Sequence, residues 1–256
     1  MRRAMIPPPP AIFQVGHLER LPLGTPYPAI VARVGRLLTE LPGDPELVID
    51  FTGVGRPIFD MFVYSGIFPI GVVITAGNAE TRDGMTCFVP KLTLVSHLQA
   101  LLHQGRLKIL RELDEAETLV RELQDFRVDF TAAGHLTFNA RSGKHDDLVL
   151  ALGIATWRAH GGGMGSWESF QTLRRVMDGT ASEPRYFVGV DLGQSRDPTA
   201  IAVVRRVEPP APAQDDCGLK PKPTPQPGSV EPGEAFAAAP ICGHHRGRQL
   251  MDIRSP

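Results

Sequence analysis

Short apolar runs alternate with longer segments of helical periodicity along most of the chain, and this alternation limits the folds open to it. The strand-like runs cover residues 11–23, 47–50, 69–75 and 107–110. The segments with helical periodicity cover residues 25–41, 56–66, 90–104, 114–126 and 144–159, and a hairpin is predicted around 132–134. Strands and helices that alternate through short turns are typical of an α/β protein built on one sheet.

The remaining residues extend this core at both ends. The chain has 256 residues, 42% of them hydrophobic, which suffices for one domain spanning 11–158 after an irregular, proline-ended lead-in at 1–10. Residues 159–185 combine a glycine-rich break with a helical segment and are predicted to be a linker. Residues 186–206 predict two strands joined by a polar turn. Residues 207–256 hold ten of the 24 prolines and are predicted to be disordered.

Four acidic residues lie at the ends of apolar elements, and we call them the acidic cluster: Asp50, Asp146, Asp147 and Asp191. A carboxylate beside an apolar run costs free energy unless it is paired, hydrogen-bonded or bound to a metal. Brought together, such carboxylates form an oxygen site suited to Mg²⁺ or Mn²⁺. Each could instead be a turn former or a helix N-cap. Asp197, which precedes a proline, fits the role of a turn residue.

Four separated segments of the chain resemble the nuclease domain of phage terminase large subunits. Three are similar to the first, second and third acidic motifs of that family: GVDLGQSRDPTAIAVV, VIDFTGVGRPIFDMF and KHDDLVLALGIATW. A fourth, FVPKLTLVSHLQALL, is similar to the segment between the second and third motifs. The resemblance covers residues 11–158 and 186–206. It implies an α/β fold of the RNase H-like kind, a mixed β-sheet flanked by helices.

The same resemblance implies an activity and assigns roles to the acidic cluster. It implies a hydrolase that cuts DNA as an endonuclease, with two Mg²⁺ or Mn²⁺ ions, in phage DNA packaging. Asp191, Asp50 and Asp147 would be the metal ligands, and Asp146 a further catalytic residue. Asp147 is favoured over Asp146 as a ligand because its spacing to Ala151 resembles the final motif of the family. Two metal ions can activate water and stabilise the leaving oxygen in phosphodiester cleavage.

The order of the motifs departs from the family. There, the strand with the first aspartate precedes all others, whereas here it lies in the C-terminal region at 186–206. The chain therefore resembles a circular permutation, or the end of one gene copy joined to the start of another. Strands pair without regard to covalent order, so the first strand of the sheet is predicted to come from 186–206 and to lie beside 11–23 and 47–50. Alternatively, this hairpin serves a neighbouring chain or has no role.

Charge limits how the chain can bind DNA. It has 27 basic and 28 acidic residues and a net charge of −1, whereas a DNA-binding domain usually has a basic excess. Contacts to DNA phosphates are predicted for basic residues near the acidic motifs: Lys144, His145, Lys91 and Arg141. Any one of them could instead be ordinary surface charge. The expected partners are double-stranded DNA and other terminase subunits or the portal.

Some motifs and segments are absent from the sequence. No GxxxxGK[ST] phosphate loop is present, so the ATPase motor of a complete terminase is not expected in this chain. No small-molecule cofactor is expected. No apolar run is long enough to span a bilayer, and the N-terminus lacks the apolar part of a secretory signal. These features predict no membrane partner and a location in the cytoplasm of the bacterial host.

Two other interpretations of the chain remain open. It could be a catalytically inactive prophage terminase remnant that keeps the fold and binds partner subunits. The missing motor and the changed motif order favour the remnant, whereas retention of every acidic motif favours the enzyme. DLGQS could also be the phosphate loop of an actin-like ATPase or sugar kinase, but the second glycine-rich motif of that fold is not found. Convergence of Asp191, Asp50 and Asp147 in space would favour the nuclease.

Overall fold

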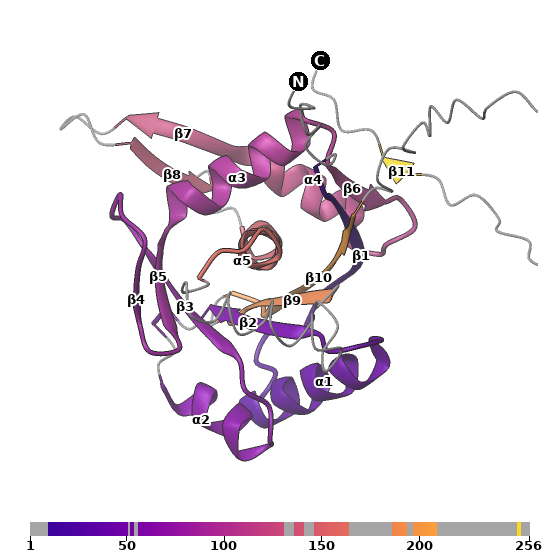
Figure 1. Cartoon of the computed structure of the whole chain (residues 1–256), viewed down its shortest axis with the longest axis vertical. Coiled ribbons are helices and arrows are strands. Elements are labelled where there is room, and N and C mark those ends of the chain that lie inside the picture. The colour runs from indigo at the N-terminus through magenta and orange to yellow at the C-terminus, as the bar shows by residue number, and fades with distance from the viewer. Residues whose placement is uncertain are drawn as a thin grey trace, which may run out of the picture.

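A mixed sheet of nine strands forms the centre of the computed structural model, which describes residues 10–50, 52–53, 56–130, 136–140, 146–163, 186–193, 197–208 and 250–251 (Figure 1). The strand order is β11-β6-β1-β10-β9-β2-β3-β5-β4. The strands of this sheet are β1 (Ile12–Arg20), β2 (Glu46–Asp50), β3 (Ile70–Thr75), β4 (Thr81–Asp83), β5 (Thr86–Pro90), β6 (Leu107–Leu110), β9 (Tyr186–Asp191), β10 (Ala200–Val207) and β11 (Leu250–Met251).

The described helices cover both faces of this sheet. They are α1 (Tyr27–Glu40), α2 (Arg56–Tyr64), α3 (Lys91–His103), α4 (Ala116–Asp125) and α5 (Asp147–Ala159). Figure 1 shows α1 and α2 on one side of the central strands and α5 on the other, where α3 and α4 flank it. A separate antiparallel pair, β7 (Phe126–Phe130) and β8 (Leu136–Ala140), forms the predicted hairpin.

The hairpin of β9 and β10 occupies the middle of the sheet. β10 pairs with β1 in antiparallel fashion, and β9 pairs with β2 in parallel. Both strands are buried on both faces, which is typical of interior strands. The predicted fold class is therefore confirmed: a mixed sheet is flanked by helices, and one central strand comes from the C-terminal region. The predicted position of this hairpin beside β1 and β2 is also observed.

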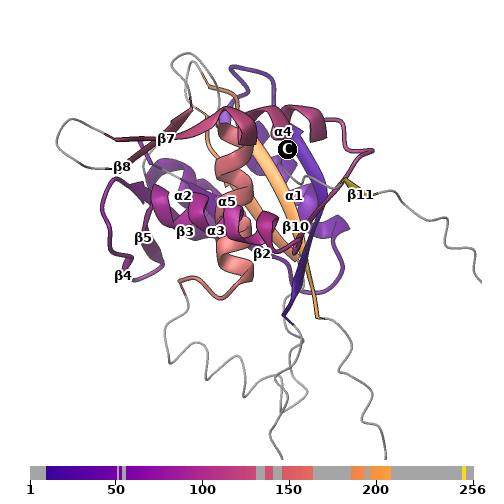
Figure 2. The ribbon, with the colours of Figure 1, turned by 90° about the horizontal axis from the view of Figure 1, so that it is seen from above.

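Side chains along β9 alternate between two cores. Val188 and Val190 pack with α1 and α2, whereas Phe187 packs with α3, α4 and α5. Gly189 also faces α5, because a Cβ at this position would lie 2.0 Å from the carbonyl oxygen of Ala151. Figure 2 shows α5 lengthwise, between α3 and the central strands. The missing side chain at Gly189 thus lets α5 lie directly on the sheet.

Replacing Gly189 by alanine should destabilise the fold. Because the new Cβ would meet backbone, α5 would have to shift, and overpacking of this kind costs about 2–3 kcal/mol. The free energy of unfolding, measured by urea titration, gives the size of the loss. Gly16→Ala is the matched control: Gly16 is also in a strand, but no atom lies within 4 Å of a Cβ built there, so a change within about 0.5 kcal/mol is expected. Equal losses in both variants would contradict this packing argument.

A histidine pair lies where α3 meets the end of α5. The rings of His97 and His160 are 4.9 Å apart, and Nε2 of His97 is buried without a hydrogen-bond partner in the described part of the chain. Burial, together with the charge of His160, lowers the pKa of His97 to about 4. The folded protein therefore keeps His97 neutral at pH values where the unfolded chain takes up a proton.

Stability should consequently depend on His97 in mild acid. The unfolded chain protonates this histidine near pH 6.5, but the folded chain only near pH 4. The stability that His97 contributes is therefore complete above pH 6.5 and is lost as the pH falls to 4. The His97→Gln variant removes this proton uptake. We compare the free energies of unfolding of the variant and of wild type at pH 6.5 and at pH 4. The difference should shift in favour of the variant by about 1–2 kcal/mol at the lower pH, after allowance for partial exposure. Urea titrations at the two pH values measure the difference, and a constant difference would contradict the prediction.

The structure differs from the sequence prediction at the edges of the sheet. The short strands β4 and β5 were not predicted; β4, at the edge of the sheet, is only three exposed residues. Within the predicted disordered tail at 207–256, β11 pairs with β6, so that prediction is corrected at 250–251. The physical reason is that β6 has an open edge, whose backbone groups accept a further strand. The remainder of that tail from 209, and residues 164–185 of the predicted linker, lie outside the described residues.

No helix within the described ranges has both the length and the apolarity needed to cross a membrane.

Candidate functional site

A row of residues across the sheet brings two carboxylates of the acidic cluster side by side. Arg20 on β1 pairs with Ala200 on β10, and Ala200 pairs with Asp191 on β9. Asp191 in turn pairs with Asp50 at the end of β2. Neighbouring strands lie about 4.8 Å apart, and paired residues direct their side chains to the same face. The row therefore places Arg20, Asp191 and Asp50 on one face.

The face in question is the one that α5 covers. Gly189 contacts Ala151 of α5, and Asp191 follows Gly189 by two residues, so the side chain of Asp191 points to the face that α5 covers. Asp147, the first residue of α5, precedes Ala151 by one helical turn. The contact at Gly189 thus fixes the position of α5 along β9. As a result, the buried first residue of α5, Asp147, lies near the end of β9. Asp146 comes directly before Asp147.

Like charges within the acidic cluster act on one another. Burial raises the pKa of Asp191 well above its usual range, and the negative charges of the other three cluster members raise it further. Burial likewise raises the pKa of Asp50. Lys91 opposes both shifts, since its positive charge lowers the pKa of each carboxyl. The four carboxyl groups therefore lie near enough for the charges of the other three to act on Asp191.

Asp50 is fixed in place by Thr52. Its Oδ1 accepts hydrogen bonds from the backbone N–H of Thr52 at 2.8 Å and from the Thr52 hydroxyl at 2.6 Å. The hydroxyl oxygen itself accepts a hydrogen bond of 2.7 Å from the N–H of Ile74 on β3. This chain of bonds ties the carboxylate to two strands and fixes its orientation.

Lys91, the first residue of α3, lies beside the acidic cluster. Its Nζ is 2.7 Å from Oδ2 of Asp146. The structure thus places this predicted phosphate contact next to the carboxylates. The three other predicted DNA contacts, Arg141, Lys144 and His145, lie outside the described residues.

Three other aspartates have different surroundings. Asp60 on α2 and Asp83 on β4 are exposed. Asp197 is also exposed and lies across the β9–β10 turn from Gly193, whose N–H donates a hydrogen bond of 3.1 Å to the Thr199 hydroxyl. A side chain at Gly193 would collide with the Asp197 carbonyl, so this turn requires glycine.

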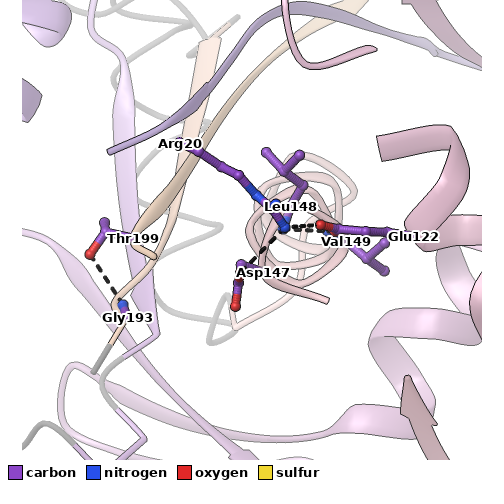
Figure 3. A network of polar contacts seen from close by, with 7 residues as sticks. All are labelled: Arg20, Glu122, Asp147, Leu148, Val149, Gly193 and Thr199. Carbon is purple, nitrogen blue, oxygen red and sulfur yellow. Dashed lines mark hydrogen bonds and ion pairs between the residues drawn. The ribbon is translucent and has the colours of Figure 1, made fainter. Parts of the chain in front are cut away.

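Sequence reasoning missed two charged residues at this site, Arg20 and Glu122 (Figure 3). Arg20 donates a short hydrogen bond to Glu122, and its Nη2 is 3.4 Å from Oδ2 of Asp147. Burial raises the pKa of Glu122 to about 7, against the opposing charge of Arg20. Glu122 was detectable in principle, because it occupies the buried face of α4 together with Ala116 and Leu119.

The carboxylates supply oxygen donors, but they do not form a complete metal-binding site. Among the described residues, no three His, Cys, Asp or Glu side chains are grouped closely enough to hold one ion. Two of the carboxylates instead have basic neighbours, since Asp147 faces Arg20 and Asp146 pairs with Lys91. The site therefore combines strongly interacting carboxyl groups with two cations that offset part of their charge.

Comparison with known proteins identifies relatives of the chain. It is 27% identical to the terminase large subunit of Thermus phage G20c over 141 residues, which are 55% of this chain and 26% of that protein. This chain is a sequence relative of terminase large subunits. The terminase large subunit of Thermus virus P23-45 is 28% identical over 138 residues, 54% of this chain and 25% of that protein. The chain thus spans about a quarter of the length of these terminases.

Two further comparisons complete this result. The crystal structure of the large terminase nuclease from thermophilic phage G20c aligns with 57% of this chain and 81% of that chain, at 22% sequence identity and a TM-score of 0.40. No protein-family model matches the sequence. The resemblance to terminase large subunits that the sequence predicted is confirmed, whereas the roles of the individual carboxylates remain predictions.

Proposed function

We propose that this chain is a metal-dependent endonuclease with an RNase H-like fold, which cleaves DNA phosphodiester bonds in phage DNA packaging. One observation carries the proposal. Asp191 and Asp50 are paired across β9 and β2, and the start of α5 brings Asp146 and Asp147 close enough for their charges to raise the pKa of Asp191. The sequence relatives are terminase large subunits, which agrees with this activity.

The residues present fit a divalent cation. The acidic cluster offers only carboxylate oxygens, the donors that Mg²⁺ and Mn²⁺ prefer. Burial raises the pKa of Asp191 and of Asp50, neighbouring negative charges raise both further, and a bound cation would relieve both effects. Asp191, Asp50 and Asp147 would hold the metal, and Asp146 would assist them. When bound, a pair of metal ions would supply an activated water and stabilise the leaving oxygen.

The other residues of the site would orient the carboxylates and the DNA. Thr52 keeps Asp50 in one orientation through two hydrogen bonds. Lys91 offsets part of the negative charge and is proposed to contact a phosphate next to the acidic cluster. Arg141, Lys144 and His145 come shortly before Asp146 in the chain and are proposed as further phosphate contacts. The proposed partners are double-stranded DNA and other terminase subunits or the portal.

A closed circular plasmid tests the proposed activity. An endonuclease nicks or linearises such DNA, whereas an exonuclease finds no end. We expect the purified chain to nick the plasmid with Mg²⁺ or Mn²⁺ and to stop when EDTA removes the metal. Cutting that persists in EDTA would exclude the proposed mechanism.

The second candidate function is that of an inactive remnant that binds partner subunits. It is favoured by the changed order of the acidic motifs and by the absence, within the described residues, of a three-ligand metal group. A chain that folds cooperatively but leaves the plasmid intact at every Mg²⁺ and Mn²⁺ concentration would support this alternative.

A further inference from the structure

The first turn of α5 is capped from a different helix. Asp146, at the N-cap position, makes no side-chain capping hydrogen bond. Instead, Oε2 of Glu122 on α4 accepts hydrogen bonds from the N–H groups of Leu148 at 3.1 Å and Val149 at 3.2 Å. Such N–H groups have no partner within their own helix, and a carboxylate suits the positive end of the helix dipole. Glu122 therefore anchors the turn that begins with Asp147.

Arg20 joins this anchor to the acidic cluster. It is the last residue of β1 and belongs to the row that contains Asp191 and Asp50. Its guanidinium lies between two carboxylates, Glu122 and Asp147 (Figure 3). The Arg20 side chain is 20% exposed, and those of Glu122 and Asp147 are 7% and 8% exposed. The three side chains thus form a largely buried link between β1, α4 and α5.

We propose that Arg20 and Glu122 are positioning residues that hold Asp147 opposite Asp191 against the repulsion between the two carboxylates. The proposal rests on the proposed function, in which Asp147 and Asp191 bind the same metal site. Glu122 fixes the backbone of the first turn, and Arg20 fixes the Asp147 side chain. Partners of this kind, which do not touch the metal themselves, change its affinity by orienting the ligands.

Charge alone predicts a different result from positioning. A guanidinium near a cation site repels the cation, so the charge of Arg20 by itself weakens metal binding. Arg20→Lys keeps the charge but replaces the rigid guanidinium, whose Nη2 contacts both carboxylates, with an ammonium group on a flexible stem. If Arg20 acts only through charge, this variant should bind metal like wild type. If Arg20 positions Asp147, the variant should bind metal more weakly.

The experiment measures Mn²⁺ binding by electron paramagnetic resonance of the free ion, alongside plasmid nicking over a Mn²⁺ titration. The variants are Arg20→Lys, Glu122→Gln and the double variant. We expect each single variant to raise the Kd for Mn²⁺ about tenfold. The Kd of the double variant should be no higher than that of a single variant, because the two residues act as a unit. At saturating Mn²⁺, the cutting rate should return to within about twofold of wild type, which a merely misfolded site would not do.

Arg33→Lys is the matched control. Arg33 pairs with Glu19 at 2.8 Å and is about as exposed as Arg20, but Glu19 precedes Arg20 on β1 and directs its side chain to the opposite face. This variant should bind Mn²⁺ like wild type. Thermal unfolding checks that each variant folds; should one fail, the other single variant carries the test.

The outcomes separate this inference from the function on which it rests. Wild-type affinity in folded Arg20→Lys and Glu122→Gln, while wild type itself binds Mn²⁺ and cuts, would overturn the positioning role alone. Independent, additive losses in the double variant would also overturn it. A wild-type chain that neither binds Mn²⁺ nor cuts would overturn the proposed function and this inference together.

Discussion

The Asp191→Asn variant should lose DNA cutting and at the same time be more stable than wild type. Asparagine keeps the shape of the side chain but removes a carboxyl group whose ionisation is opposed by burial and by three neighbouring negative charges. We expect cutting to fall by more than about a hundredfold, beyond the loss typical for residues that only support metal ligands. We expect the free energy of unfolding to rise by about 1 kcal/mol at neutral pH, the trade-off usual for active-site residues.

The gain in stability should depend on pH. The pKa of Asp191 is raised in the folded state, so its contribution to stability is complete below its usual value of 3.8 and is lost as the pH rises. The advantage of Asp191→Asn should therefore be absent below pH 3.8 and grow above it. Urea titrations across this range measure the effect, with the exposed Asp60→Asn as control. An Asp191→Asn variant that is less stable than wild type and still cuts would contradict the account.

Metal affinity and cutting should fall together in the Asp50→Asn variant. The remaining oxygen of asparagine can still accept the hydrogen bonds from Thr52, so the local structure should persist while one negative charge is lost. We expect Mn²⁺ affinity and the cutting rate at limiting Mn²⁺ to drop about 10- to 100-fold. A nicking assay and a binding titration over the same Mn²⁺ range measure both quantities.

Asp60→Asn is again the control for this second change. Asp60 is an exposed aspartate on α2, on the face of the sheet away from α5, and its replacement should leave cutting and Mn²⁺ affinity nearly unchanged. If Asp50→Asn cuts as well as wild type, the assignment of the site is wrong even though the activity is real.

The central position of the β9–β10 hairpin could be predicted from the sequence because burial depends on composition and not on covalent order. Residues 187–190 and 200–204 are apolar on both faces, which only an interior position can satisfy. The same argument located Asp191 and Asp50, since each ends such a strand. Their direct pairing follows from strand register, which the sequence does not display.

Other features depend on contacts that no local pattern reveals. Arg20 ends a strand and resembles a solvated charge, and its partner Glu122 lies 102 residues further along the chain. The strand β11 has only two residues, and it forms because β6 offers an open edge. Charge partners and edge pairing are properties of the assembled fold, so no local sequence pattern predicts them.

The most direct test of the central claim measures Mn²⁺ occupancy and plasmid nicking on the same sample of wild-type chain. We predict that the chain binds Mn²⁺ and that nicking rises with occupancy over the same concentration range. We also predict that Asp191→Asn loses both. A wild-type chain that folds but binds no Mn²⁺, or one whose nicking is independent of Mn²⁺, would contradict the claim.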